Sequence, residues 1–137
     1  MNTKLLMSSA AILMGFIGIA LSFAPDDILR ALNMAPDLIA KLTLQILGAV
    51  YLGFAMLNWM AKGALIGGIF AKPISMGNGV HFFIGAMALI KAVTKTAGTP
   101  LIWVACGVYA LYAVCFLYVA FSAPTESKKT TSSILRT

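Results

Sequence analysis

A few polar side chains interrupt an otherwise apolar stretch of this sequence, and they are the residues that could bind a ligand or transfer a proton. The candidate ligand-binding residues are Tyr51, Asn58, Lys62, Lys72, Asn78 and His81. An imidazole can relay a proton or hold a ligand near neutral pH, but in apolar surroundings it is costly without a partner. His81 is therefore a functional candidate, with Asn58 or Asn78 as its expected neighbour. The alternative is a structural histidine that donates one proton to a carbonyl or an asparagine.

The residue sets that catalysis or metal binding would need are not found in the sequence. No Asp or Glu lies within the long apolar runs, so an acid–base pair across the membrane lacks a second member. One histidine cannot form a metal site alone, and Cys106 and Cys115 fall on opposite faces of one helix. We therefore expect no catalytic residue, no metal and no cofactor, and favour a non-enzymatic role.

The composition explains which elements must position these residues. Of the 137 residues 61% are apolar and 10% are charged, which is too apolar for one soluble core. The ten Lys and Arg residues are scattered singly and form no patch with interleaved aromatic residues, so no nucleic-acid partner is expected. Basic residues at the ends of apolar runs are typical of membrane proteins. The lipid bilayer is therefore the first expected partner.

Four apolar runs are long enough to cross a bilayer as helices, and this predicts an all-α integral membrane four-helix bundle. The expected spans are residues 5–24, 38–60, 74–93 and 101–121, and together they form one domain, residues 1–121. Residues 122–137 are predicted to be a disordered, polar cytoplasmic tail. The first run is longer than the apolar region of a signal peptide, so we interpret it as a span.

The sequence also predicts the structure of the segments between the spans. Residues 26–32 are expected to form a short interfacial helix, and Pro36 to lie in the first turn of span two beside Asp37. Residues 63–73 are expected to be an irregular interfacial or re-entrant joint, with Ser75 as the N-cap of span three. The alternative is one long helix kinked at Pro73.

Small residues at helical spacing predict which faces of the spans pack together. The residues assigned to helix packing are Gly15, Gly18, Gly48 and Gly85. Asn58 and His81 belong to the small and polar faces of spans two and three. If those faces meet, both side chains lie near one end of the bundle, with Lys62 and Lys72 close to the lipid headgroups.

The basic residues divide unevenly between the two ends of the spans. One side holds Lys4, Lys62, Lys72, Lys128, Lys129 and Arg136, and the other holds Arg30, Lys41, Lys91 and Lys95. Because cytoplasmic loops carry an excess of Lys and Arg, we predict that both termini are cytoplasmic. The joint of spans two and three then lies on the cytoplasmic side.

Three short strings resemble those of small bacterial four-helix membrane proteins. They are residues 47–54, 56–59 and 77–82, and the broad form is similar to the DoxX-like group. The resemblance implies the four-helix fold and a bacterial cytoplasmic (inner) membrane. It also implies a redox accessory role, from which this sequence departs because its two cysteines face apart.

Three functions remain open from the sequence. The first is a non-enzymatic protein that binds a small amphiphile, a lipid or a membrane-protein partner at the cytoplasmic-side joint of spans two and three. The second is a small transporter or channel subunit that forms a homo-oligomer and uses His81 in its pathway. The third is a redox accessory or enzyme that acts on quinones or thiols. We favour the first.

Overall fold

The computed structural model describes residues 2–63, 71–95 and 100–122. These residues form five α-helices and no strand: α1 (Thr3–Phe23), α2 (Pro25–Ala31), α3 (Leu38–Ala61), α4 (Ala71–Lys95) and α5 (Pro100–Ser122). All except α2 contain a stretch long and apolar enough to cross a membrane. The predicted all-α class with four membrane-spanning helices is therefore confirmed, and the chain is a multi-pass membrane protein. The predicted tail, residues 122–137, lies outside the described residues except for Ser122.

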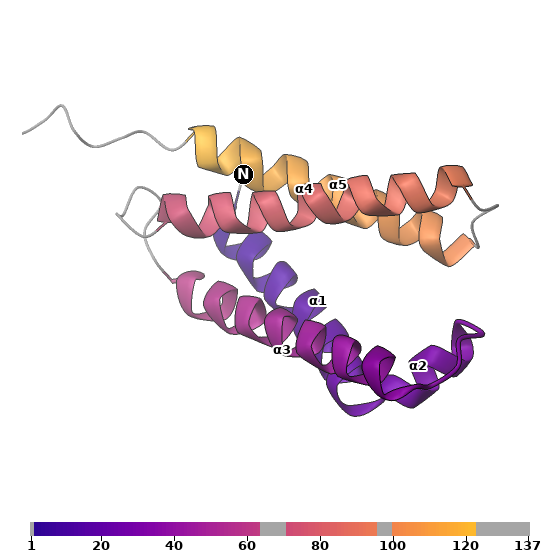
Figure 1. Ribbon diagram of the computed structural model, residues 1–137. Coiled ribbons are helices and arrows are strands. Elements are labelled where there is room, and N and C mark those ends of the chain that lie inside the picture. The colour runs from indigo at the N-terminus through magenta and orange to yellow at the C-terminus, as the bar shows by residue number, and fades with distance from the viewer. Residues whose placement is uncertain (1, 64–70, 96–99, 123–137) are drawn as a thin grey trace, which may run out of the picture. The chain divides into compact units, whose positions relative to one another are not determined.

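The chain divides into two compact units, Met1–Gly63 and Ala64–Thr137, and each is described by itself. In the first unit α1 packs along α3, and α2 contacts both at one end of this hairpin (Figure 1). In the second unit α4 packs along α5. Each unit is thus a helical hairpin, which buries one face of every long helix.

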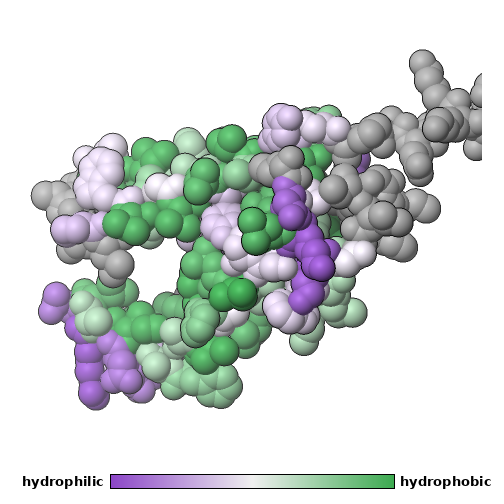
Figure 2. Space-filling view, turned by 180° about the vertical axis from the view of Figure 1, so that it is seen from behind, coloured by the Kyte–Doolittle hydropathy of each residue, from purple (hydrophilic) through white to green (hydrophobic). Residues whose placement is uncertain are grey.

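The large apolar side chains on the other faces are exposed. Phe16, Ile39, Met60 and Phe121 are each more than 70% exposed, and Figure 2 shows apolar side chains over much of the visible surface. In water such surfaces would aggregate, whereas in a bilayer they face acyl chains. The exposed faces therefore match the membrane environment inferred from helix length.

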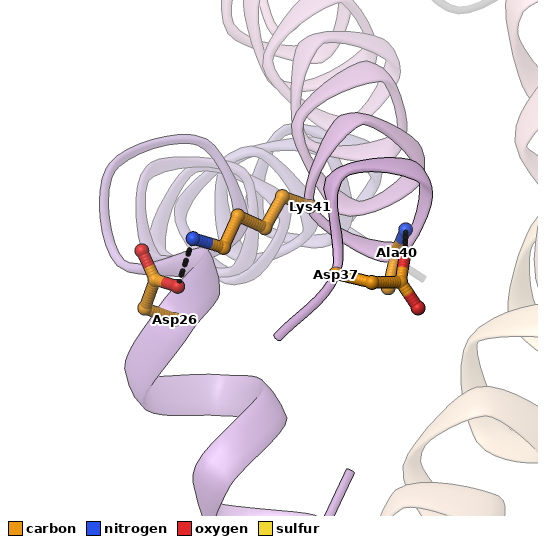
Figure 3. Close-up of polar contacts among 4 residues, drawn as sticks. All are labelled: Asp26, Asp37, Ala40 and Lys41. Carbon is orange, nitrogen blue, oxygen red and sulfur yellow. Dashed lines mark hydrogen bonds and ion pairs between the residues drawn. The ribbon is translucent and has the colours of Figure 1, made fainter. Parts of the chain in front are cut away.

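Polar caps begin both long helices of the first hairpin. The Asn2 side chain accepts a hydrogen bond from the Leu5 backbone N–H at 3.3 Å, and Asp37 accepts one from Ala40 at 2.8 Å (Figure 3). Asp37 is the N-cap of α3, so the prediction that Pro36 lies in the first helical turn is wrong. The carboxylate takes the capping position because it can satisfy a backbone N–H that has no partner within the helix.

The corner between α1 and α3 is built by α2. Proline begins this helix at Pro25, and Asn33, with φ 56°, ends it in the left-handed conformation. The N–H groups of Asn33 and Met34 bond the carbonyls of Arg30 and Leu29, both at 2.9 Å, which is the Schellman pattern. An expected short helix is therefore present, one residue earlier than predicted.

An ion pair joins this corner to α3. Lys41 Nζ lies 2.6 Å from Asp26 Oδ1, and both side chains are partly exposed (Figure 3). Because an exposed ion pair contributes only about 0–1 kcal/mol, it orients α2 more than it stabilises the hairpin.

The start of α4 differs from the prediction. The helix begins at Ala71, so Pro73 lies in its first turn and Ser75 is a helical residue; the assignment of Ser75 as an N-cap is wrong. The physical reason is that the first backbone N–H groups of a helix need no partner within it, so a proline there does not interrupt the hydrogen-bond ladder. Residues 64–70 of the predicted joint lie outside the described residues.

In the first hairpin the backbones of α1 and α3 approach most closely at two glycines. A Cβ atom on Gly18 would lie 3.0 Å from the Gly48 carbonyl oxygen, and one on Gly48 would lie 2.9 Å from the Gly18 oxygen. The Ser22 side chain also occupies the space beside Gly48. Only a residue without a side chain allows the two backbones to approach this closely, so both glycines are required by packing.

Candidate functional site

In the first hairpin, Asn58 is the most deeply buried polar residue of the candidate set. Its exposed fraction is 0%, and Tyr51, on the same face of α3, is 7% exposed. Asn58 Nδ2 donates to the Phe54 carbonyl at 3.0 Å and to Met14 Sδ, on α1, at 3.7 Å. The hydrogen bond to the carbonyl one turn earlier offsets much of the free-energy cost of burying the carboxamide. Asn58 therefore links α3 to α1 inside the hairpin.

A cation and an indole lie together at the C-terminal end of α3. Lys62 is the C-cap residue, and its Nζ lies over the ring of Trp59. Trp59 is 50% exposed and Lys62 is partly exposed, so both reach the surface of the unit. Tryptophan and lysine at a helix end suit the membrane–water interface, where the ring lies at headgroup depth and the ammonium remains hydrated. An anion that approached this end would meet the charge first.

In the second hairpin, α4 carries two buried polar residues close to its start. Ser75 is 0% and Asn78 1% exposed, and Asn78 Nδ2 donates to the Ile74 carbonyl at 2.9 Å. Among the described residues Ser75 Oγ makes no hydrogen bond. Lys72 lies in the first turn and is exposed. The first two turns of α4 therefore combine an exposed cation with buried hydrogen-bonding groups.

His81 lies at the edge of an aromatic cluster between α4 and α5. Its ring centroid is 5.2 Å from that of Phe82 and 6.2 Å from that of Tyr109. Phe82, which is 0% exposed, also stacks on Tyr112 at 4.9 Å and Phe116 at 5.9 Å. His81 itself is half-buried. The imidazole is thus held by rings on both helices, and its Nε2 atom is buried.

The aromatic cluster contains the main residue that the sequence reasoning missed. This residue is Phe82, which the sequence analysis assigned to no face of a span. Its position four residues after Asn78 and seven after Ser75 places it on the same side of the helix, and this spacing was available in the sequence. Gly85 belongs to the same contact, because a Cβ there would lie 2.6 Å from the Tyr109 ring.

The structure divides the candidate residues equally between the hairpins. Tyr51 and Asn58 lie on α3 and Lys62 is its C-cap, while Lys72, Asn78 and His81 lie on α4. The proposed neighbourhood of Asn58 and His81 stays a prediction. Within the described residues no three His, Cys, Asp or Glu side chains gather in a group that could hold a metal ion, and Cys106 and Cys115 are free thiols.

Comparison with protein-family models, with curated proteins and with solved structures finds no match for this chain. The similarity to the DoxX-like group therefore stays a prediction from three short strings.

Proposed function

We propose that this multi-pass membrane protein is not an enzyme and binds a small anionic amphiphile or lipid headgroup. The binding groups are the basic and aromatic side chains at the end of α3, in the first hairpin. The observation that supports this most directly is the Lys62 ammonium held over the partly exposed Trp59 ring, one turn after the buried Asn58. A cation fixed at the membrane interface attracts an anionic headgroup, and the indole offers an apolar surface to the start of an acyl chain.

The second hairpin, considered by itself, offers such a ligand a cation and an imidazole on α4. Lys72 is exposed in the first turn, and His81 is half-buried beside Tyr109. Hydrogen-bond donors of this kind recognise phosphate or carboxylate oxygens. Asn58 and Asn78 bond carbonyls of their own helices, so we assign them to shaping the site.

The binding experiment compares anionic and zwitterionic lipids. The protein in neutral detergent is titrated with short-chain phosphatidylglycerol or phosphatidylcholine, and bound lipids are counted by native mass spectrometry while Trp59 fluorescence is recorded in a Trp103→Phe background. One basic residue near a membrane surface contributes about 1 kcal/mol, so Lys62→Gln should weaken phosphatidylglycerol binding about fivefold. His81→Ala should weaken it as well.

Lys41→Gln is the matched control, because Lys41 lies at the opposite end of α3 and is paired with Asp26. Its binding should equal that of the unsubstituted protein. Equal affinity for the two lipids, or an equal loss in Lys41→Gln and Lys62→Gln, would remove the proposed site.

We also propose that both termini and the α3–α4 joint face the cytoplasm of a bacterial inner membrane. Lys4 at the start of α1 and Lys62 after the end of α3 occupy one end of the first hairpin. Arg30 and Lys41 share the other end with Asp26, Asp27 and Asp37, so the net positive end is that of Lys4 and Lys62. In a Cys106→Ala, Cys115→Ala background, a cysteine at Lys4 should be labelled by an impermeant maleimide only after cell lysis. Labelling of intact spheroplasts would reverse the orientation.

A further inference from the structure

The first hairpin has a lysine near each end of α3, and the two ammonium groups are held in different ways. Lys41 Nζ lies 2.6 Å from Asp26 Oδ1, so a carboxylate neutralises its charge. Lys62 Nζ lies instead 2.7 Å from the centroid of the Trp59 ring. All the acidic residues of this hairpin belong to the opposite end, formed by α2 and the start of α3: Asp26, Asp27 and Asp37. The positive charge of Lys62 is therefore not cancelled by an acidic side chain of its own hairpin.

The geometry of the helix end places the ammonium on the ring. Trp59 and Lys62 are three positions apart, so their side chains are neighbours on the helix surface. Lys62 keeps helical backbone angles, with φ −58° and ψ −22°, and its N–H bonds the Asn58 carbonyl at 3.0 Å. Because helical side chains lean towards the preceding turn, the Lys62 stem runs back over Trp59. One face of the indole is therefore occupied by a cation of the protein itself.

We propose that this pair, Lys62 on Trp59, sets the headgroup specificity of the site by excluding headgroups that contain a cation. The inference rests on the proposed function and names the class of headgroup that the site selects. An open indole face binds quaternary ammonium groups such as that of choline. Here Lys62 covers the face and repels a second cation. A phosphate whose headgroup has no ammonium, as in phosphatidylglycerol, is only attracted.

The experiment measures binding of short-chain phosphatidylcholine and phosphatidylglycerol to the full-length protein in neutral detergent by native mass spectrometry. Lys62→Gln uncovers the ring face, so phosphatidylcholine binding should rise about 2- to 5-fold while phosphatidylglycerol binding falls. Adding Trp59→Leu to Lys62→Gln should remove the rise. Lys62→Arg should keep the original selectivity, because a guanidinium also carries a charge and stacks on aromatic faces.

Two further measurements assign the effect to this ring and to the choline cation. Trp103→Leu in the Lys62→Gln background is the matched control for Trp59→Leu, since Trp103 is also exposed but lies on α5, and the rise should persist. Tetramethylammonium chloride should displace phosphatidylcholine from Lys62→Gln more strongly than sodium chloride at the same ionic strength.

The outcomes separate this inference from the proposed function. Unchanged phosphatidylcholine binding in Lys62→Gln, or a rise that persists without Trp59, would overturn the inference alone if the unsubstituted protein still prefers phosphatidylglycerol. Equal affinity of the unsubstituted protein for the two lipids would remove the proposed function. Phenylalanine offers a cation a weaker face than tryptophan, so Trp59→Phe with Lys62→Gln should give a smaller rise and serves as the test if Trp59→Leu folds poorly.

Discussion

The crossing of Gly18 and Gly48 yields the sharpest test of the structure. A methyl group on Gly18 would lie 3.0 Å from the Gly48 oxygen and from the Leu52 nitrogen, both backbone atoms that cannot rotate away. Ordinary contact begins near 3.4 Å, so the Gly18→Ala variant must separate the helices by about 0.4 Å at this point. A gap of about 0.5 Å already forfeits about a quarter of each dispersion contact along the seam.

The expected cost follows from overpacking and from the absence of a hydrophobic driving force in lipid. Overpacking costs about 1–3 kcal/mol, and in a membrane the packing that it disturbs is a main source of helix association. Alanine also has a higher helix propensity than glycine by up to about 1 kcal/mol, which opposes this loss. The matched variant Gly15→Ala receives the same propensity gain, but its Cβ would lie 3.8 Å from Ala55 Cβ, in ordinary contact. The difference between the two variants therefore isolates the crossing.

The assay is unfolding by sodium dodecyl sulfate in mixed micelles, followed by Trp59 fluorescence in a Trp103→Phe background. Gly18→Ala should have a free energy of unfolding about 1–3 kcal/mol below that of Gly15→Ala. If the two variants unfold at the same detergent fraction, the helices do not approach as closely as described and the reasoning is refuted.

Further predictions follow for the same assay. The double variant Gly18→Ala, Gly48→Ala should lose less free energy of unfolding than the two single variants lose together, because one separation of the helices relieves both clashes. Additive losses would show that the two contacts are independent. Phe82→Ala, followed by Trp103 fluorescence in a Trp59→Phe background, should destabilise the second hairpin by about 2 kcal/mol, less than in a soluble core because transfer to lipid costs little. In the same background Phe83→Ala, at a half-exposed position, should change the free energy of unfolding by under about 0.5 kcal/mol. Asp37→Ala should lower the free energy of unfolding by about 1 kcal/mol because α3 loses its cap, and Asp37→Ser should retain most of it; equal losses in the two variants would exclude the cap.

The spans were predictable because bilayer thickness sets the length of an apolar helix. The close glycines were predictable too, since Gly18 and Gly48 belong to stripes of small residues. The first turn of α4 was not, because proline is compatible with a helix start as well as with a break. Pro73 was interpreted as part of an irregular joint, and Ser75 became a cap in consequence.

The candidate site was less predictable, because a buried carboxamide has two solutions that look alike in a sequence. It can bond a neighbouring helix, or it can bond a carbonyl one turn earlier in its own helix. Asn58 and Asn78 both bond a carbonyl of their own helix, that of Phe54 and that of Ile74, and Asn58 also donates to Met14 Sδ on α1. The sequence reasoning considered only partners on other helices. Phe82 was missed for a related reason, since an aromatic residue in a span suits lipid as well as a helix interface.

The two hairpins are held by different contacts, and this difference bears on where a ligand could bind. The first is closed by backbone atoms at Gly18 and Gly48, which leave no volume to fill. The second is closed by stacked rings around the fully buried Phe82. Among the described residues no Lys, Arg, Asp or Glu is buried in either hairpin, whereas an anionic headgroup requires a positive charge. The end of α3, where Lys62 and Trp59 reach the surface, is therefore the position that we propose for an anionic headgroup.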